Sequence, residues 1–236
     1  MSIAENVARI RSEMKEAAIA AGRDPGEILL CAATKMNDAD AVRQAIRAGV
    51  DCCGENRVQE LTAKLAENAY DGAPVHFIGH LQTNKVKQVV GKVDLIQSVD
   101  SERLLKAIDR EAARQGIIQN ILLEVNIGEE DSKSGFQAED IPEIVEKLVE
   151  FPNVCMKGLM AIPPISQKEG ENLKFFQKMF HLSVDIKNKI DDNVMVDCLS
   201  MGMSADYADA IMCGSTMIRV GTAIFGARDY AKLHQG

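Results

Sequence analysis

Residues 28–54 read ILLCAATKMNDADAVRQAIRAGVDCCG, and this stretch contains a strand, a helix and a second strand in succession. The run Ile28–Thr34 is too short for a core helix and is apolar at almost every position, which is typical of a parallel strand buried on both faces. Asp38 belongs to the residue types that cap helices, and the helix that it begins ends at Gly49. Val50–Gly54 then forms the second short strand. We therefore expect a strand–helix–strand unit at this point of the chain.

The same unit recurs along the rest of the sequence. The predicted strands are Ile28–Thr34, Val50–Gly54, Val75–Ile78, Val93–Ser98, Ile121–Asn126, Cys155–Met160, Val194–Ser200 and Met217–Val220. The predicted helices are an amphipathic one from Ile3 that ends at Gly22, then Asp38–Gly49, Glu55–Ala66, Asn84–Val90, Ser101–Gly116, one through Ile144 and Leu148, one from Leu173 to Val184, and Ala205–Met212. This alternation predicts a single (β/α)8 barrel domain over residues 1–236, with an extra N-terminal helix. An open doubly wound sheet is the alternative, and the lack of a GxGxxG motif after the first strand disfavours it.

Composition restricts the classes of protein that this chain can belong to. The net charge of −8 argues against a nucleic-acid partner, which would require a basic surface. No window approaches the roughly 18 consecutive apolar residues that cross a bilayer, and no basic-then-apolar leader begins the chain. The six cysteines and four histidines show no zinc-type spacing, so we expect reduced, buried thiols and no metal. We expect a cytoplasmic protein that binds neither membranes nor nucleic acids.

The loops after the last two predicted strands carry a phosphate-binding pattern. Working residues of such barrels lie at the carboxyl ends of the strands, and phosphate sites are often built from the loops after strands seven and eight. Ser200 and Ser204 bring hydroxyl donors to the first loop, and Thr222 brings one to the second. Gly221 lets the backbone approach a ligand closely. Either loop alone is more simply an ordinary turn, but the two together favour a phosphate site.

Other polar residues follow the remaining predicted strands. Lys35 comes directly after the first strand, where partial desolvation beside a phosphate site suits a lysine that forms an imine. Taken alone, such a lysine is usually a solvated loop residue. Arg219 can meet the far edge of a ring held by that imine, and its alternative role is a salt bridge at the barrel rim. Asn56 can hydrogen-bond a ring substituent, whereas a lone His80 is more simply satisfied by backbone groups.

These residues occur within motifs that cover nearly the whole chain. The motifs are Gly54-Glu55-Asn56 with Val58-Gln59-Glu60, His76-Phe77-Ile78-Gly79 with Leu81-Gln82 and Asn84-Lys85, Val125-Asn126-Ile127 with Ser132-Lys133-Ser134-Gly135, Gly158 to Pro163, Leu199 to Ser204 with Asp206, and Gly214 to Thr222 with Ile224-Phe225-Gly226. In them the chain resembles the pyridoxal-phosphate homeostasis proteins, single-domain relatives of the N-terminal barrel of alanine racemase.

The resemblance implies a cofactor and a role for each site residue. Lys35 would hold pyridoxal 5′-phosphate (PLP) as a Schiff base, Asn56 would line the ring, and Arg219 would lie near the pyridine nitrogen. The residues implied around the phosphate and beside the cofactor are Ser200, Ser204, Gly221, Thr222 and Met201. The resemblance also implies PLP storage without established catalytic turnover, with PLP-dependent apo-enzymes as recipients. A guanidinium at the ring nitrogen weakens the cofactor as an electron sink.

The chain departs from the family pattern beside the lysine. The family usually has Ser before this lysine and Pro shortly after it, whereas Thr34 precedes Lys35 here and Met36-Asn37-Asp38 follow. The hydroxyl is kept, but the loop after the lysine is less constrained. This difference bears on the geometry of the imine lysine and not on its identity.

Two other functions remain open on the sequence. A PLP-dependent racemase of the related type needs a second base, a tyrosine from an additional domain, but the tyrosines here are Tyr70, Tyr207 and Tyr230, and we expect no such domain after Gly226. A barrel without that domain would lack a major dimer contact, so we expect a monomer. A Schiff-base aldolase for sugar phosphates is disfavoured because only Glu55 and Glu124 stand out as additional proton-handling groups.

Overall fold

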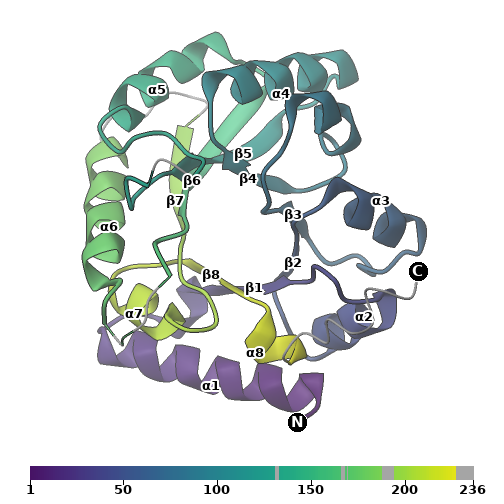
Figure 1. The fold of residues 1–236 in the computed structure, drawn as a ribbon, viewed down its shortest axis with the longest axis vertical. Coiled ribbons are helices and arrows are strands. Elements are labelled where there is room, and N and C mark those ends of the chain that lie inside the picture. Colours follow the sequence, from purple (N-terminus) through teal and green to yellow (C-terminus); the bar gives the residue numbers. More distant parts are fainter. Residues whose placement is uncertain (131–132, 166–167, 169, 188–193, 227–236) are drawn as a thin grey trace.

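Eight parallel strands close into a barrel in which each strand pairs with its neighbours in chain order and β1 pairs with β8 (Figure 1). This computed structural model describes residues 1–130, 133–165, 168, 170–187 and 194–226. The strands are β1 (Leu29–Ala33), β2 (Cys52–Glu55), β3 (Val75–Phe77), β4 (Leu95–Val99), β5 (Gln119–Val125), β6 (Val154–Ala161), β7 (Val194–Ser200) and β8 (Met217–Val220). The prediction of a (β/α)8 barrel from the strand–helix alternation is confirmed.

Helices surround the barrel on its outer side (Figure 1). They are α1 (Ile3–Ala20), α2 (Ala39–Arg47), α3 (Val58–Ala66), α4 (Glu102–Gln115), α5 (Ile141–Lys147), α6 (Leu173–Lys187), α7 (Tyr207–Met212) and α8 (Thr222–Phe225), with 3-10 helices η1 (Pro25–Glu27), η2 (Thr83–Gln88) and η3 (Leu148–Glu150). The extra N-terminal helix is confirmed as α1, which packs along α7 and α8. A capping box of Ser2 and Glu5 begins it. In the part of the chain that is described, none of the helices is long and apolar enough to cross a membrane.

Some predicted element boundaries differ from the structure. The helix expected from Glu55 begins at Val58, because Glu55 instead extends β2 and pairs with Phe77 of β3. The helix expected at Asn84–Val90 is the 3-10 helix η2, and α8 was not predicted. Since the chain is still in a strand at Glu55, that side chain points into the protein and is fully buried.

The strands separate two apolar clusters. The larger one lies between the barrel and its helices and includes Leu30 and Ala32 of β1. The smaller cluster contains the strand residues Cys31, Cys52, Leu95, Leu122, Met160 and Met217. Because successive side chains of a strand point to opposite faces, this second cluster fills the barrel interior. The interior is therefore packed, and ligands are expected at its ends rather than through it.

Candidate functional site

One cavity at the carboxyl ends of the strands brings together three of the predicted site residues. Lys35 lies two residues after the end of β1, Gly221 follows β8 directly, and Thr222 begins α8. All three line a cavity of about 750 Å³, which is within the usual size range for a small-molecule site. Since β1 and β8 are hydrogen-bonded neighbours, closure of the barrel is what places the lysine beside the last loop.

A buried ion pair supports the backbone next to Lys35. Lys64 of α3, which also lines the cavity, donates from Nζ to Glu55 Oε1 at 2.5 Å and to the Thr34 carbonyl oxygen at 2.8 Å. The Thr34 hydroxyl donates to the same Glu55 oxygen at 2.5 Å. Both charged side chains are almost completely buried. Sequence reasoning missed Lys64, although its helical spacing from Leu61 indicates the buried face of α3.

Asn56 lies at the end of β2 with an unused acceptor. Its Oδ1 atom is buried and has no hydrogen-bond partner within the described residues. Its backbone is held by close contact with Gly79, where a Cβ atom would lie 2.1 Å from the Asn56 carbonyl oxygen. Only glycine fits at that distance. A buried acceptor without a partner is costly unless a ligand or water satisfies it, so Asn56 fits a residue that binds a ligand.

Arg219 and Ser200 meet inside the barrel. Arg219 Nη1 donates to Ser200 Oγ at 2.5 Å, and Nη2 donates to the Ala161 carbonyl oxygen at 2.9 Å. Ser200 Oγ in turn donates to Gln97 Oε1 at 2.7 Å. Burial lowers the pKa of Arg219. The Ser200 hydroxyl, expected at the phosphate, is thus already paired with Gln97 and Arg219, because its position on β7 directs it into the interior.

The loop after β7 contacts the start of α8. Ser204 Oγ accepts from the Ala223 backbone N–H at 3.4 Å, so the two loops predicted to form a phosphate site do lie together. Gly202, in the loop after β7, has φ of +93°, and its carbonyl oxygen accepts a hydrogen bond from the Arg219 backbone N–H at 3.0 Å. Met201 is fully buried in the outer core, where it does not line the cavity. Of this loop, Ser204 is the residue placed to reach α8.

A carboxyl group with a raised pKa lies at the same end of the barrel. Burial, with a smaller contribution from Asp100, raises the pKa of Glu124 to about 7. Asp100 Oδ2 lies 3.0 Å from Nδ1 of the exposed His80. Ser132 of the sequence motifs and Tyr230 lie outside the described residues. Glu124 is therefore a group that exchanges protons near neutral pH at the mouth of the barrel.

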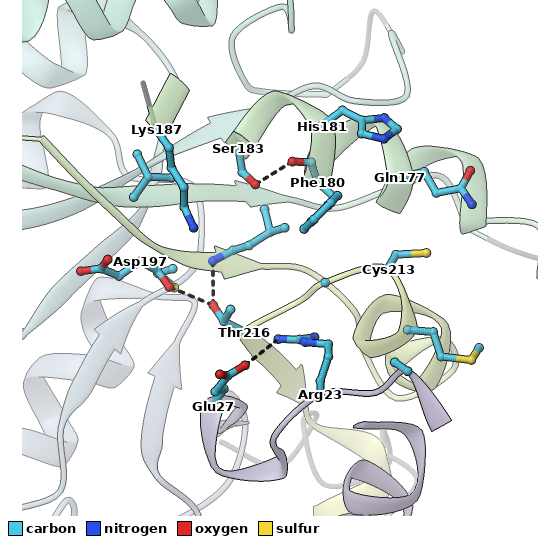
Figure 2. A pocket seen from close by; sticks show the side chains of 16 residues that line it. Arg23, Glu27, Gln177, Phe180, His181, Ser183, Lys187, Asp197, Cys213 and Thr216 are labelled. Carbon is cyan, nitrogen blue, oxygen red and sulfur yellow. Dashed lines mark hydrogen bonds and ion pairs between the residues drawn. The ribbon is translucent and has the colours of Figure 1, made fainter. Parts of the chain in front are cut away.

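A second cavity lies away from these residues. It has a volume of about 580 Å³, and Figure 2 shows Arg23 and Glu27 on one side of it and Phe180 and Lys187 on the other. The Arg23 guanidinium donates to the carbonyl oxygens of Ile211 and Ser215, both at 2.8 Å. None of the eight predicted site residues lines this cavity. Through these two hydrogen bonds Arg23 holds the end of α7 and the loop before β8.

Comparison with known proteins identifies the family. The family model described as "Alanine racemase, N-terminal domain" matches residues 2–229. A "Pyridoxal phosphate homeostasis protein" of Pasteurella multocida is 38% identical, with 98% of this chain and 100% of the relative covered. The chain belongs to this family. The resemblance stated from the sequence motifs is confirmed, and the family's barrel is the one that the structure contains.

Two solved structures have the same fold and related sequences. A protein from Bifidobacterium adolescentis described as unknown has a TM-score of 0.89 and 38% identity, covering 94% of each chain. The family member PipY of Synechococcus elongatus, with PLP bound, has a TM-score of 0.82 and 33% identity, covering 95% of this chain and all of PipY. A family member at this similarity therefore holds PLP in this type of barrel.

Proposed function

We propose that this chain binds PLP through an imine bond to Lys35 and serves in PLP homeostasis. Support comes first from the cavity that Lys35, Gly221 and Thr222 line together, which places a lysine beside the loop after β8. The unpaired, buried Oδ1 of Asn56 also fits a ligand at this end of the barrel. The relatives named pyridoxal phosphate homeostasis proteins and the PLP-bound PipY support the same cofactor.

The proposed roles follow from where each side chain lies. PLP supplies an aldehyde for the amine and a phosphate for the loops. Lys35 provides that amine, and the Glu55–Lys64 pair holds the Thr34 backbone that precedes it. Ser204, Gly221 and Thr222 would receive the phosphate, and Arg219 would lie near the pyridine nitrogen.

We further propose that the protein is a cytoplasmic monomer of one domain that binds PLP without catalytic turnover. PLP-dependent apo-enzymes would be the recipients of this PLP. Light scattering of the purified chain tests the monomer. Transfer is tested by mixing the PLP-loaded protein with an apo-enzyme in the presence of a PLP scavenger, and direct delivery predicts that activity returns despite the scavenger.

Absorbance spectroscopy tests the cofactor and its lysine. After addition of PLP, a yellow band that borohydride removes is expected, together with a pyridoxyl mass increment on the peptide that contains Lys35. The Lys35→Ala variant should lack both, whereas Lys92→Ala at an exposed position should retain both. Lys64 lines the same cavity, so mapping the increment to Lys35 and not to Lys64 is part of the result.

Two further assays, adduct formation with a sugar phosphate and amino-acid racemisation, distinguish the alternatives. An adduct with a sugar phosphate but none with PLP would replace this proposal by a Schiff-base aldolase. Amino-acid racemisation that disappears in Lys35→Ala would replace the role without turnover by a racemase-like activity.

A further inference from the structure

Three soft or borderline metal ligands meet inside the barrel. Cys31 of β1, Cys52 of β2 and His76 of β3 come from three consecutive strands, and a ligand atom from each lies within 4.8 Å of the other two. Cys31 and Cys52 are register partners in the sheet. Sequence spacing gave no metal motif, because these residues are separated by whole strand–helix units that only the closed barrel brings together.

The distance between two of the ligands is close to that of a tetrahedral site. Metal–sulfur bonds of about 2.3 Å and metal–nitrogen bonds of about 2.0 Å place sulfur and nitrogen roughly 3.5 Å apart around a tetrahedral ion. Cys52 Sγ lies 3.6 Å from His76 Nδ1. Gln97 Nε2 contacts the same nitrogen at 2.9 Å and Met217 Sδ at 3.1 Å. An ion would take the Nδ1 lone pair from Gln97, which keeps its contact to the thioether.

The charge of the ligands suits a divalent ion. Two thiolates and a neutral imidazole carry a total charge of −2, which a dication balances, and the buried guanidinium of Arg219, the register partner of Cys31, is a further positive charge in the same interior. Binding releases the thiol protons to solvent. Thiolate and thioether ligands select zinc-like or copper(I)-like ions over Mg²⁺ and Ca²⁺.

A cavity of about 300 Å³ at the amino ends of the strands reaches one of the three ligands, His76. Met217 also lines it, as do the carboxylates Glu27, Asp94 and Asp197 and one lysine, Lys157. This excess of negative charge raises the local concentration of cations at the entrance. The entrance lies at the end of the barrel opposite Lys35.

We propose that Cys31, Cys52 and His76 form a binding site for a thiophilic divalent cation such as Zn²⁺, separate from the cavity of Lys35. The ion would join β1, β2 and β3 from inside the barrel. Removal of one ligand is expected to weaken binding more than about 100-fold, since even the partners that only orient ligands contribute about 10–100-fold.

Zn²⁺ titration against a chromophoric chelator, with the purified full-length chain, tests this site. Wild type should bind one high-affinity Zn²⁺ and melt at a higher temperature with it, and Co²⁺ should give thiolate-to-metal charge-transfer absorption. Cys31→Ser and Cys52→Ser should lose these effects. Cys53→Ser is the matched control, because Cys53 is equally buried but belongs to the outer cluster.

X-ray absorption at the zinc edge of the wild-type protein keeps the test decisive if the serine variants fail to fold. Two sulfur neighbours at about 2.3 Å and nitrogen at about 2.0 Å are expected. The proposal is overturned if Zn²⁺ does not bind, if binding survives both serine substitutions, or if oxidation instead joins Cys31 and Cys52 as a disulfide that excludes the metal.

Discussion

Substitution of Lys64 by Met tests the buried ion pair that supports Lys35. The variant leaves the Glu55 carboxylate buried, with its contact to the Thr34 hydroxyl but without its cation. Breaking a buried pair by removing one partner costs about 3–5 kcal/mol, because the remaining charge has no compensation. For a chain of this length, each kcal/mol of lost stability lowers the thermal unfolding midpoint by roughly 2 °C. The thermal midpoint of the variant should therefore fall by about 6–10 °C.

Urea unfolding followed by circular dichroism measures the lost free energy of unfolding, and thermal melts measure the fall in the midpoint. The double variant Glu55→Gln/Lys64→Met should recover most of the stability, since neither charge of the pair then remains buried. Together with the single variants Glu55→Gln and Lys64→Met it completes a double-mutant cycle, which gives the coupling energy between the two side chains. Lys147→Met is the matched control, because its ion pair with Glu143 lies on the surface and should contribute little. A loss in Lys64→Met no larger than that in Lys147→Met would refute the reasoning.

Three further substitutions test the site. Glu124→Gln removes a group whose pKa is raised to about 7, so its ionisation destabilises wild type progressively between about pH 4.5 and 7. Thermal melts should show the variant more stable at pH 8 by up to about 3 kcal/mol and similar to wild type at pH 4, and a constant difference would contradict this. Gly79→Ala places a Cβ against the Asn56 carbonyl oxygen and should lose about 3 kcal/mol or more in urea unfolding, whereas an unchanged midpoint would exclude that contact. Ser200→Ala leaves the Arg219 guanidinium short of an acceptor and should lose about 1–3 kcal/mol in the same assay; full stability would mean that the hydroxyl is not part of the interior network.

Much of the fold was predictable from local sequence. Short apolar runs such as Ile28–Thr34 are buried strands whatever follows them, and the helices between them leave only a barrel or an open sheet as solutions. Lys35 was predictable as a mouth residue for the same reason, since the carboxyl ends of all strands in a barrel meet at one face. Boundaries such as Glu55 were not, because hydrogen bonding to β3 overrides the helical pattern there.

The details of the site were decided by tertiary structure. Side-chain direction alternates along a strand, so only the register of β7 shows that the Ser200 hydroxyl faces Arg219 in the interior. The pairing of Lys64 with Glu55 depends on how α3 packs against the end of β2. By itself the sequence determined the existence of the strands, their order along the chain and the loops that follow them, because these depend on local pattern and chain connectivity. Which of those residues touch was determined by barrel closure, because contacts between distant segments depend on register and packing that no local pattern encodes.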